Sequence, residues 1–174
     1  MYRIIRIGDK EIPMKAMASV DRYYKRIFHV DPIKLQSSGE IDDGDMVEFV
    51  MQMGFIMAKF AELNDGAKMA NLNEDDYTAW LDGFERTDYL NALLDIRLAY
   101  EGQSATVVEA KKKQRRTERV MTTALFVLRA IQIGLRLEDL DSLEYGEVVD
   151  LMIESANDDY EYKILATQED FDRF

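Results

Sequence analysis

The chain opens with a short alternation of apolar and polar positions, and longer helical periods follow. Residues 2–7 and 11–17 alternate apolar with polar side chains, and Gly8 begins the short stretch between them. A period of two on either side of a glycine-containing turn predicts a β-hairpin. Pro13 has no backbone N–H, so its strand is predicted to be an edge strand.

Three helical patterns follow the hairpin. Ser19 is placed to cap a helix that Pro32 would stop, with a loop at residues 37–39. Residues 45–63 carry apolar side chains around most of a helix circumference, which predicts a central core helix. Its apolar positions are Met46, Val47, Phe49, Val50, Met53, Ile56, Met57 and Phe60.

An aromatic helix is predicted after residue 73. Asn73 and Asp76 have the spacing of a helix cap, and the helix they start carries Trp80, with Phe84 four residues later. We expect both rings to pack in the N-terminal core, near Phe55 or Phe60. A second helix restarts at residue 87 and is closed by glycine 102.

The rest of the chain is predicted to be helical and to end in an acidic tail. Residues 105–133 lack glycine and proline, which predicts one long helix ended by Gly134. Another helix is expected over about 143–155, followed by an irregular tail. The predicted fold is mainly α, with a small N-terminal β-hairpin, a helical domain over residues 1–104 and a helical C-terminal extension over 105–174.

Charge is unevenly distributed along the chain. Residues 1–136 hold 20 basic and 21 acidic side chains, whereas residues 137–174 hold 2 basic and 13 acidic ones. An acidic segment repels nucleic acid and membrane phosphates, and favours solubility or a basic protein partner. No window of about 18 apolar residues is free of charge, so no membrane partner is expected and the protein is predicted to be cytoplasmic.

The sequence offers little catalytic chemistry. It has no cysteine, and its single histidine, His29, lies between Phe28 and Val30 at a predicted helix end. No phosphate-binding glycine loop or zinc-ligand spacing is present. The acidic pairs lack the ligand order of a calcium loop. We therefore expect a protein that is not an enzyme and that binds no metal or cofactor.

Two groups of residues are candidates for binding a partner. Met46, Met53 and Met57 are flexible apolar side chains that could fit several partner shapes, although filling a core is the alternative role. The second group is basic and lies within residues 111–119. Its members are Lys111, Lys112, Lys113, Arg115, Arg116 and Arg119. Phosphate binding is one interpretation; a solvated helix face, or an internal partner for the acidic tail, is the other.

Several stretches resemble the tail assembly chaperones of long-tailed phages that infect Gram-positive bacteria. The order of aromatic and aliphatic positions in residues 55–61, 76–84 and 90–96 is similar to that family. Residues 132–141 and 146–151, with the ending 166–174, resemble the C-terminal extension of its longer member. The N-terminal hairpin followed by a helix also fits.

The resemblance implies a function in phage tail building. The shared N-terminal domain would bind the tape measure protein, and the extension would recruit subunits of the major tail tube protein. The long form would arise by ribosomal frameshifting, to which the lysine codons of residues 111–113 are suited. The protein would act in the host cytoplasm, absent from the mature virion, as a monomer or a homo-oligomer.

Two alternatives come from other functional classes. A phage or bacterial regulator could bind nucleic acid through residues 111–119, with the acidic tail competing for the same surface. The second alternative is an acidic protein that mimics DNA. Such a mimic needs acidic side chains along its whole length, and the nearly neutral first 136 residues argue against it. A salt-dependent affinity for DNA would distinguish the regulator from the chaperone, for which no nucleic-acid binding is expected.

Overall fold

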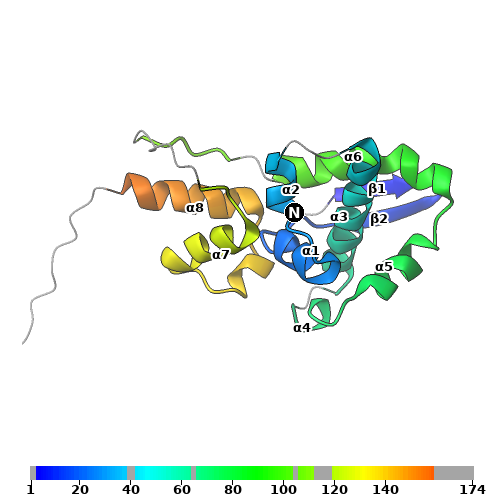
Figure 1. Cartoon of the computed structure of the whole chain (residues 1–174), viewed down its shortest axis with the longest axis horizontal. Coiled ribbons are helices and arrows are strands. Elements are labelled where there is room, and N and C mark those ends of the chain that lie inside the picture. The colour runs from blue at the N-terminus through cyan, green and yellow to red at the C-terminus, as the bar shows by residue number, and fades with distance from the viewer. Residues whose placement is uncertain (1–2, 39–41, 64–65, 104–105, 112–118, 159–174) are drawn as a thin grey trace, which may run out of the picture.

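The computed structural model describes residues 3–38, 42–63, 66–103, 106–111 and 119–158. It is mainly helical with one N-terminal hairpin, as predicted (Figure 1). The elements in chain order are β1 (Arg3–Ile7), β2 (Lys10–Met14), α1 (Val20–Phe28), α2 (Pro32–Ser38), α3 (Asp43–Leu63), α4 (Gly66–Met69), α5 (Glu74–Leu81), α6 (Arg86–Gln103), α7 (Thr123–Gln132), the 3-10 helix η1 (Asp139–Asp141) and α8 (Tyr145–Asn157).

The hairpin forms because its turn suits a tight connection. The two strands pair antiparallel with Ile5 opposite Ile12, which leaves Gly8 and Asp9 as the turn. Gly8 has φ +59, a left-handed conformation that glycine adopts without steric cost. Pro13 lies opposite Ile4 in this two-stranded sheet, in which both strands are edges.

A large core fills the N-terminal part of the molecule. Helix α3 lies at its centre and packs against α1, α5, α6 and strand β2. Phe55, Ile56 and Met57 of α3 are completely buried, which confirms the prediction of a central helix. Residues 5–99 supply every buried side chain of this first core.

The aromatic helix has the cap that its sequence predicts. The Asn73 side chain accepts hydrogen bonds from Asp75 N and Asp76 N, and the Asp76 side chain accepts from Asn73 N. The Trp80 ring lies 5.8 Å from the ring of Phe55 and 4.9 Å from that of Phe84. Trp80 is only half-buried, so it borders the first core instead of filling it.

A smaller second core lies between α7, η1 and α8 at one end of the molecule (Figure 1). The Phe126 ring of α7 stacks on the Tyr145 ring of α8 at 4.7 Å. Gly134, at φ +97, follows α7 and ends it as predicted. Helix α8 is shifted by two residues from its expected range and ends at Asn157; the acidic tail beyond residue 158 lies outside the described residues.

The predicted long helix over residues 105–133 is wrong. Residues 106–110 and 119–122 are not helical, and α7 begins only at Thr123. The Asp150 carboxylate of α8 accepts hydrogen bonds from the amides of Val107 and Val108. These amides therefore do not donate to backbone carbonyls of a helix. A helix through residues 111–119 would also place like charges one turn apart, which is unfavourable.

Three boundaries also differ from prediction. Helix α1 ends at Phe28, because His29 adopts a left-handed conformation with φ +58. Pro32 was expected to stop a helix, but it is the first residue of α2. The loop expected at residues 37–39 is helical at 37–38. Gly102 lies within the last turn of α6. Ser19 precedes α1 as predicted, but its side chain makes no capping hydrogen bond.

Candidate partner-binding groove

A groove with both polar and apolar lining side chains lies between helices α2, α3 and α6. Its volume is about 290 Å³. The groove is lined by Gln36, Met46, Phe49, Val50, Met53, Ile96, Arg97, Tyr100 and Glu101. The apolar lining side chains come from α3 and α6, whereas Gln36, Arg97 and Glu101 supply polar groups. This combination is typical of small binding sites in proteins.

Helical spacing brings the apolar lining side chains together. On α3, positions 46, 49, 50 and 53 follow the i, i+3, i+4, i+7 pattern of a single helix face. On α6, Ile96 and Tyr100 are four residues apart and therefore lie on one face as well. The contact between α3 and α6 then joins the two faces into one groove.

The three candidate methionines have different positions. Met46 and Met53 both line the groove, with Met46 half-buried and Met53 1% exposed. Met57 is fully buried in the first core, so it fills that core and is not available to a partner. Met53 is likewise part of the first core, so of the three candidates Met46 is the one that a partner can reach.

A chain of hydrogen bonds leads from the groove to a buried carboxylate. Gln36 Nε2 donates to the Tyr100 hydroxyl at 3.1 Å, and this hydroxyl donates to Asp21 Oδ1 at 2.8 Å. Asp21 is 2% exposed. Burial raises the pKa of Asp21 to about 7, opposed by the Tyr100 hydrogen bond and helped by the charge of Asp31. Burial also raises the pKa of Tyr100 well above its usual value.

Sequence analysis missed Asp21, although a signal was present. Asp21 lies three residues before Tyr24 and next to Val20, which places it on the apolar face of α1. An acidic residue in the first turn of a helix is ordinarily explained by the helix dipole. The position of Asp21 on the apolar face of α1 is the signal that this side chain is buried and not exposed to solvent.

Arg97 and Glu101 form an ion pair at the rim of the groove. Arg97 Nε lies 2.6 Å from Glu101 Oε1, one helical turn along α6. Both side chains are about half exposed, at 50% and 46%. An exposed pair of this kind contributes at most about 0.5 kcal/mol to stability. It can therefore open toward a bound partner at little cost.

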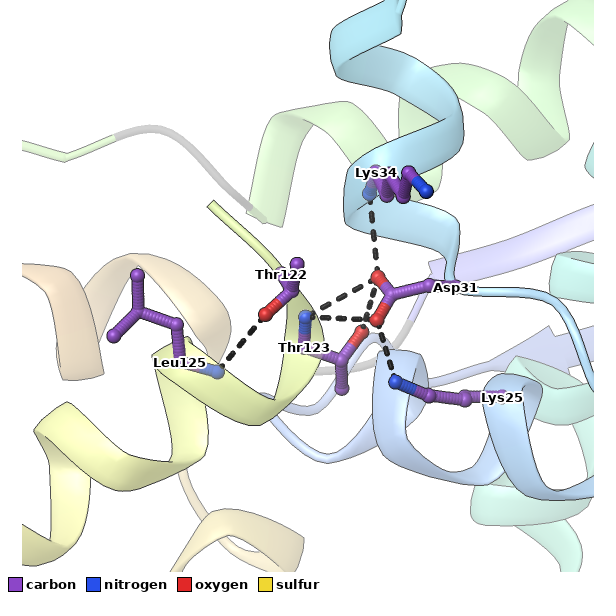
Figure 2. Close-up of polar contacts among 6 residues, drawn as sticks. All are labelled: Lys25, Asp31, Lys34, Thr122, Thr123 and Leu125. Carbon is purple, nitrogen blue, oxygen red and sulfur yellow. Dashed lines mark hydrogen bonds and ion pairs between the residues drawn. The ribbon is translucent and has the colours of Figure 1, made fainter. Parts of the chain in front are cut away.

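A second polar cluster is centred on Asp31, between α1 and α2 (Figure 2). Its carboxylate accepts hydrogen bonds from Lys25 Nζ at 2.7 Å, from Lys34 N at 3.2 Å and from Thr123 Oγ1 at 3.0 Å. Burial alone would raise the pKa of Asp31, but the hydrogen bonds from Lys25, Thr123 and Lys34 hold it below its usual value. The donors come from α1, α2 and the start of α7, so this cluster joins three helices.

The basic group is described only in part. Lys111 is exposed, and its backbone N–H donates to Asn157 Oδ1 of α8 at 2.9 Å. Arg119 is also exposed. Lys112, Lys113, Arg115 and Arg116 lie outside the described residues. The described neighbours do not form the helix on which a basic face was predicted.

Within the described ranges, no group of three or more His, Cys, Asp or Glu side chains is arranged to hold a metal ion. No helix in those ranges is long and apolar enough to span a bilayer. His29, the single histidine of the sequence, is an exposed residue at the end of α1.

Comparison with known proteins adds no relative. No protein-family model, curated protein or solved structure matches the chain. The groove and its residues are therefore the basis for a functional proposal.

Proposed function

We propose that this protein is a non-catalytic chaperone whose groove binds an apolar helical segment of a partner protein. The observation that supports this proposal is the groove between α2, α3 and α6, with its methionine-containing apolar wall and polar rim. An amphipathic helix commonly binds such a groove through apolar side chains at positions i, i+3, i+4 and i+7. The flexible, half-buried side chain of Met46 suits a partner with several similar binding segments.

The partner that we propose is the tape measure protein of a long-tailed phage. The sequence resemblance points to this partner, and the chemistry is compatible with it. A long helical chain with exposed apolar faces tends to aggregate until a binding protein covers those faces. The excess of acidic side chains in residues 137–174 would help keep such a complex in solution. Recruitment of tail tube subunits by the C-terminal part belongs to the same proposal.

Co-expression with the tape measure protein from the same gene cluster tests the proposal. We expect the tape measure protein to co-purify with the full chain and to be recovered in solution. Met46→Glu places a charge in the groove and should reduce co-purification at least about tenfold, since an unpaired charge in an apolar contact is costly. Met121→Glu is the matched control, because Met121 is 42% exposed and lies outside the groove.

The outcomes separate the proposed function from its alternatives. Failure of the wild-type chain to retain the tape measure protein would overturn the proposal. Equal losses in the two variants would overturn the assignment of the groove, provided that circular dichroism shows both to be folded. Duplex DNA serves as a further probe, and salt-dependent binding to it would favour a nucleic-acid regulator.

A further inference from the structure

Two aromatic rings belong to the lining of the groove between α2, α3 and α6. The Phe49 and Tyr100 rings meet edge to face, with their centroids 6.2 Å apart and their planes at 82°. Phe49 is 5% exposed, whereas Tyr100 and Met46 are half-buried and line the same groove. Aromatic rings and methionine sulfur both make favourable contacts with a further ring. This lining is therefore suited to a flat aromatic group.

The volume of the groove limits what can enter it. It measures about 290 Å³. An apolar protein cavity of about 150 Å³ is large enough to bind benzene, so the groove has room for a group of two fused rings. An α-helix is about 10 Å across with its side chains, and one turn of it would not fit. A partner helix would therefore lie across the opening and insert a single large side chain.

The charges at the opening of the groove balance each other. Arg97 and Glu101 are paired at 2.6 Å, and they are the only charged side chains among the described residues that line the groove. A charged group that entered the groove would lose its water without gaining an unpaired opposite charge, which is unfavourable. The inserted side chain is therefore expected to be neutral.

A chain of hydrogen bonds sets the polarity of the amide at the α2 side of the groove. An ionised carboxylate can only accept hydrogen bonds, so the Tyr100 hydroxyl donates its proton to Asp21. The same hydroxyl then accepts from Gln36 Nε2. Among the described residues, no donor reaches the other end of this amide, Gln36 Oε1. Because Gln36 lines the groove, its carbonyl oxygen can accept a hydrogen bond from a group bound there.

We propose that the groove binds the indole ring of a tryptophan side chain from a partner protein. The ring would lie against Met46 and Tyr100, and its N–H would donate to Gln36 Oε1. Indole combines two fused rings, a single hydrogen-bond donor and no charge, which are the properties that the groove favours. Tryptophan is also enriched among the side chains that dominate binding energy at interfaces. This step rests on the proposed function, because it names the side chain that anchors the partner helix.

Binding of skatole, the side-chain analogue of tryptophan, to the full chain tests the proposal. Methionine methyl groups are isotope-labelled, and NMR spectra are recorded at about pH 8, where Asp21 is ionised. Addition of skatole should shift the methyl signal of Met46. The signal of Met121, which is 42% exposed and outside the groove, should not shift. Absence of a shift at Met46 with millimolar skatole would overturn the proposal.

Two further probes test the donor and the size of the ring system. N-methylskatole carries a methyl group in place of the N–H hydrogen, and should bind about fivefold more weakly, because the hydrogen bond to Gln36 is lost. The tyrosine analogue p-cresol should also bind more weakly than skatole, because it buries less apolar area. Equal affinities for skatole and N-methylskatole, or tighter binding of p-cresol, would overturn the assignment to tryptophan.

A pair of matched variants assigns the acceptor. Gln36→Leu removes the carbonyl oxygen, so it should abolish the preference for skatole over N-methylskatole while both still bind. Gln132→Leu is the control, because Gln132 is an exposed residue of α7 outside the groove, and it should leave the preference unchanged. Circular dichroism shows whether both variants fold. A preference that survives Gln36→Leu would overturn the role of this amide.

The two proposals fail in different assays. If skatole does not bind but the tape measure protein still co-purifies with the chain, the tryptophan anchor is overturned and the proposed function stands. If skatole binds as expected but the tape measure protein does not co-purify, the proposed function is overturned and the indole site stands.

Discussion

The two cores of the molecule differ in how completely each is built from its own segment. The first core draws buried side chains from both strands and from α1, α3, α4, α5 and α6, all within residues 5–99. The second core consists of Ala18, Phe126, Ala130, Leu140 and Val148, with several half-buried neighbours. One of these buried residues, Ala18, belongs to the N-terminal part.

This difference indicates that the C-terminal part depends on the N-terminal part for its stability. Buried apolar area supplies most of the free energy of folding, so a segment that contains its whole core can fold without the rest. Residues 1–104 have such a core. Within the described part of the chain, residues 123–157 complete their core against Ala18 and Ile33. A product that ends soon after residue 104 is therefore expected to fold, whereas the C-terminal part alone is expected to be much less stable.

The largest effect is expected from Phe55→Ala in the first core. Phe55 is completely buried, and its ring lies 5.6 Å from that of Tyr77. Removing the ring should lower the free energy of unfolding by about 3–5 kcal/mol. Urea denaturation followed by the fluorescence of Trp80, the only tryptophan, measures this change. A loss below about 1 kcal/mol would contradict the importance that we assign to this core.

Asp21→Asn should change how stability depends on pH. The folded-state pKa of about 7 exceeds the usual value of 3.8, so the folded chain retains a proton that the unfolded chain releases. Wild-type stability should therefore fall as the pH rises from about 4 to 7, by about 4 kcal/mol if no other group compensates. Asparagine does not titrate, and its carbonyl can still accept the Tyr100 hydrogen bond.

Urea denaturation at several pH values tests this expectation. The variant should show a flatter curve between about pH 4 and 7 than the wild type. Asp31 has a lowered pKa, so its contribution is lost only at more acidic pH and does not obscure the comparison. Identical curves for the two proteins would show that Asp21 is ionised throughout this range.

A smaller and local effect is expected from Phe126→Ala in the second core. The Phe126 ring is 2% exposed and stacks on Tyr145. Its loss should destabilise the C-terminal part by about 2–3 kcal/mol, since a thinly covered core relaxes more readily. Proteolysis of α7 and α8 should accelerate, while the unfolding transition of Trp80 moves little. A shift of that transition equal to the Phe55→Ala shift would mean that the two cores unfold together.

The smallest effect is expected from Ser19→Ala. Ser19 is fully buried, and its hydroxyl has no hydrogen-bond partner in the described part of the chain. Replacing it should change the free energy of unfolding by less than about 0.5 kcal/mol, or increase it, because an unsatisfied buried hydroxyl is removed. A loss above about 1 kcal/mol, measured by urea denaturation, would indicate a capping role after all.

The sequence predicted elements whose signals are local. The hairpin follows from alternation around Gly8, and the cap of α5 follows from Asn73 and Asp76. The non-helical conformation of residues 106–110 was missed because its cause is distant: the amides of Val107 and Val108 donate to Asp150, more than 40 residues later. No window of neighbouring residues contains that contact.

The groove was predictable only in part. The adaptable methionines drew attention to α3, but all three lie on an element with apolar residues almost all round. Only the packing of α6 against α3 determines that Met46 lies half-buried in the groove, whereas Met53 and Met57 are buried at 1% and 0% exposure. The buried Asp21 was obscured because its partner, Tyr100, lies 79 residues away.

The contact between α8 and residues 106–111 bears on which substitutions this segment can tolerate. Backbone groups make most of the hydrogen bonds of residues 106–111, and the side chain of Val107 is 89% exposed. Almost any amino acid except proline could present the same amides to Asp150 and Asn157. Packing therefore places little constraint on the side chains of this segment. Substitutions other than proline in residues 107–111 are therefore expected to leave the fold unchanged.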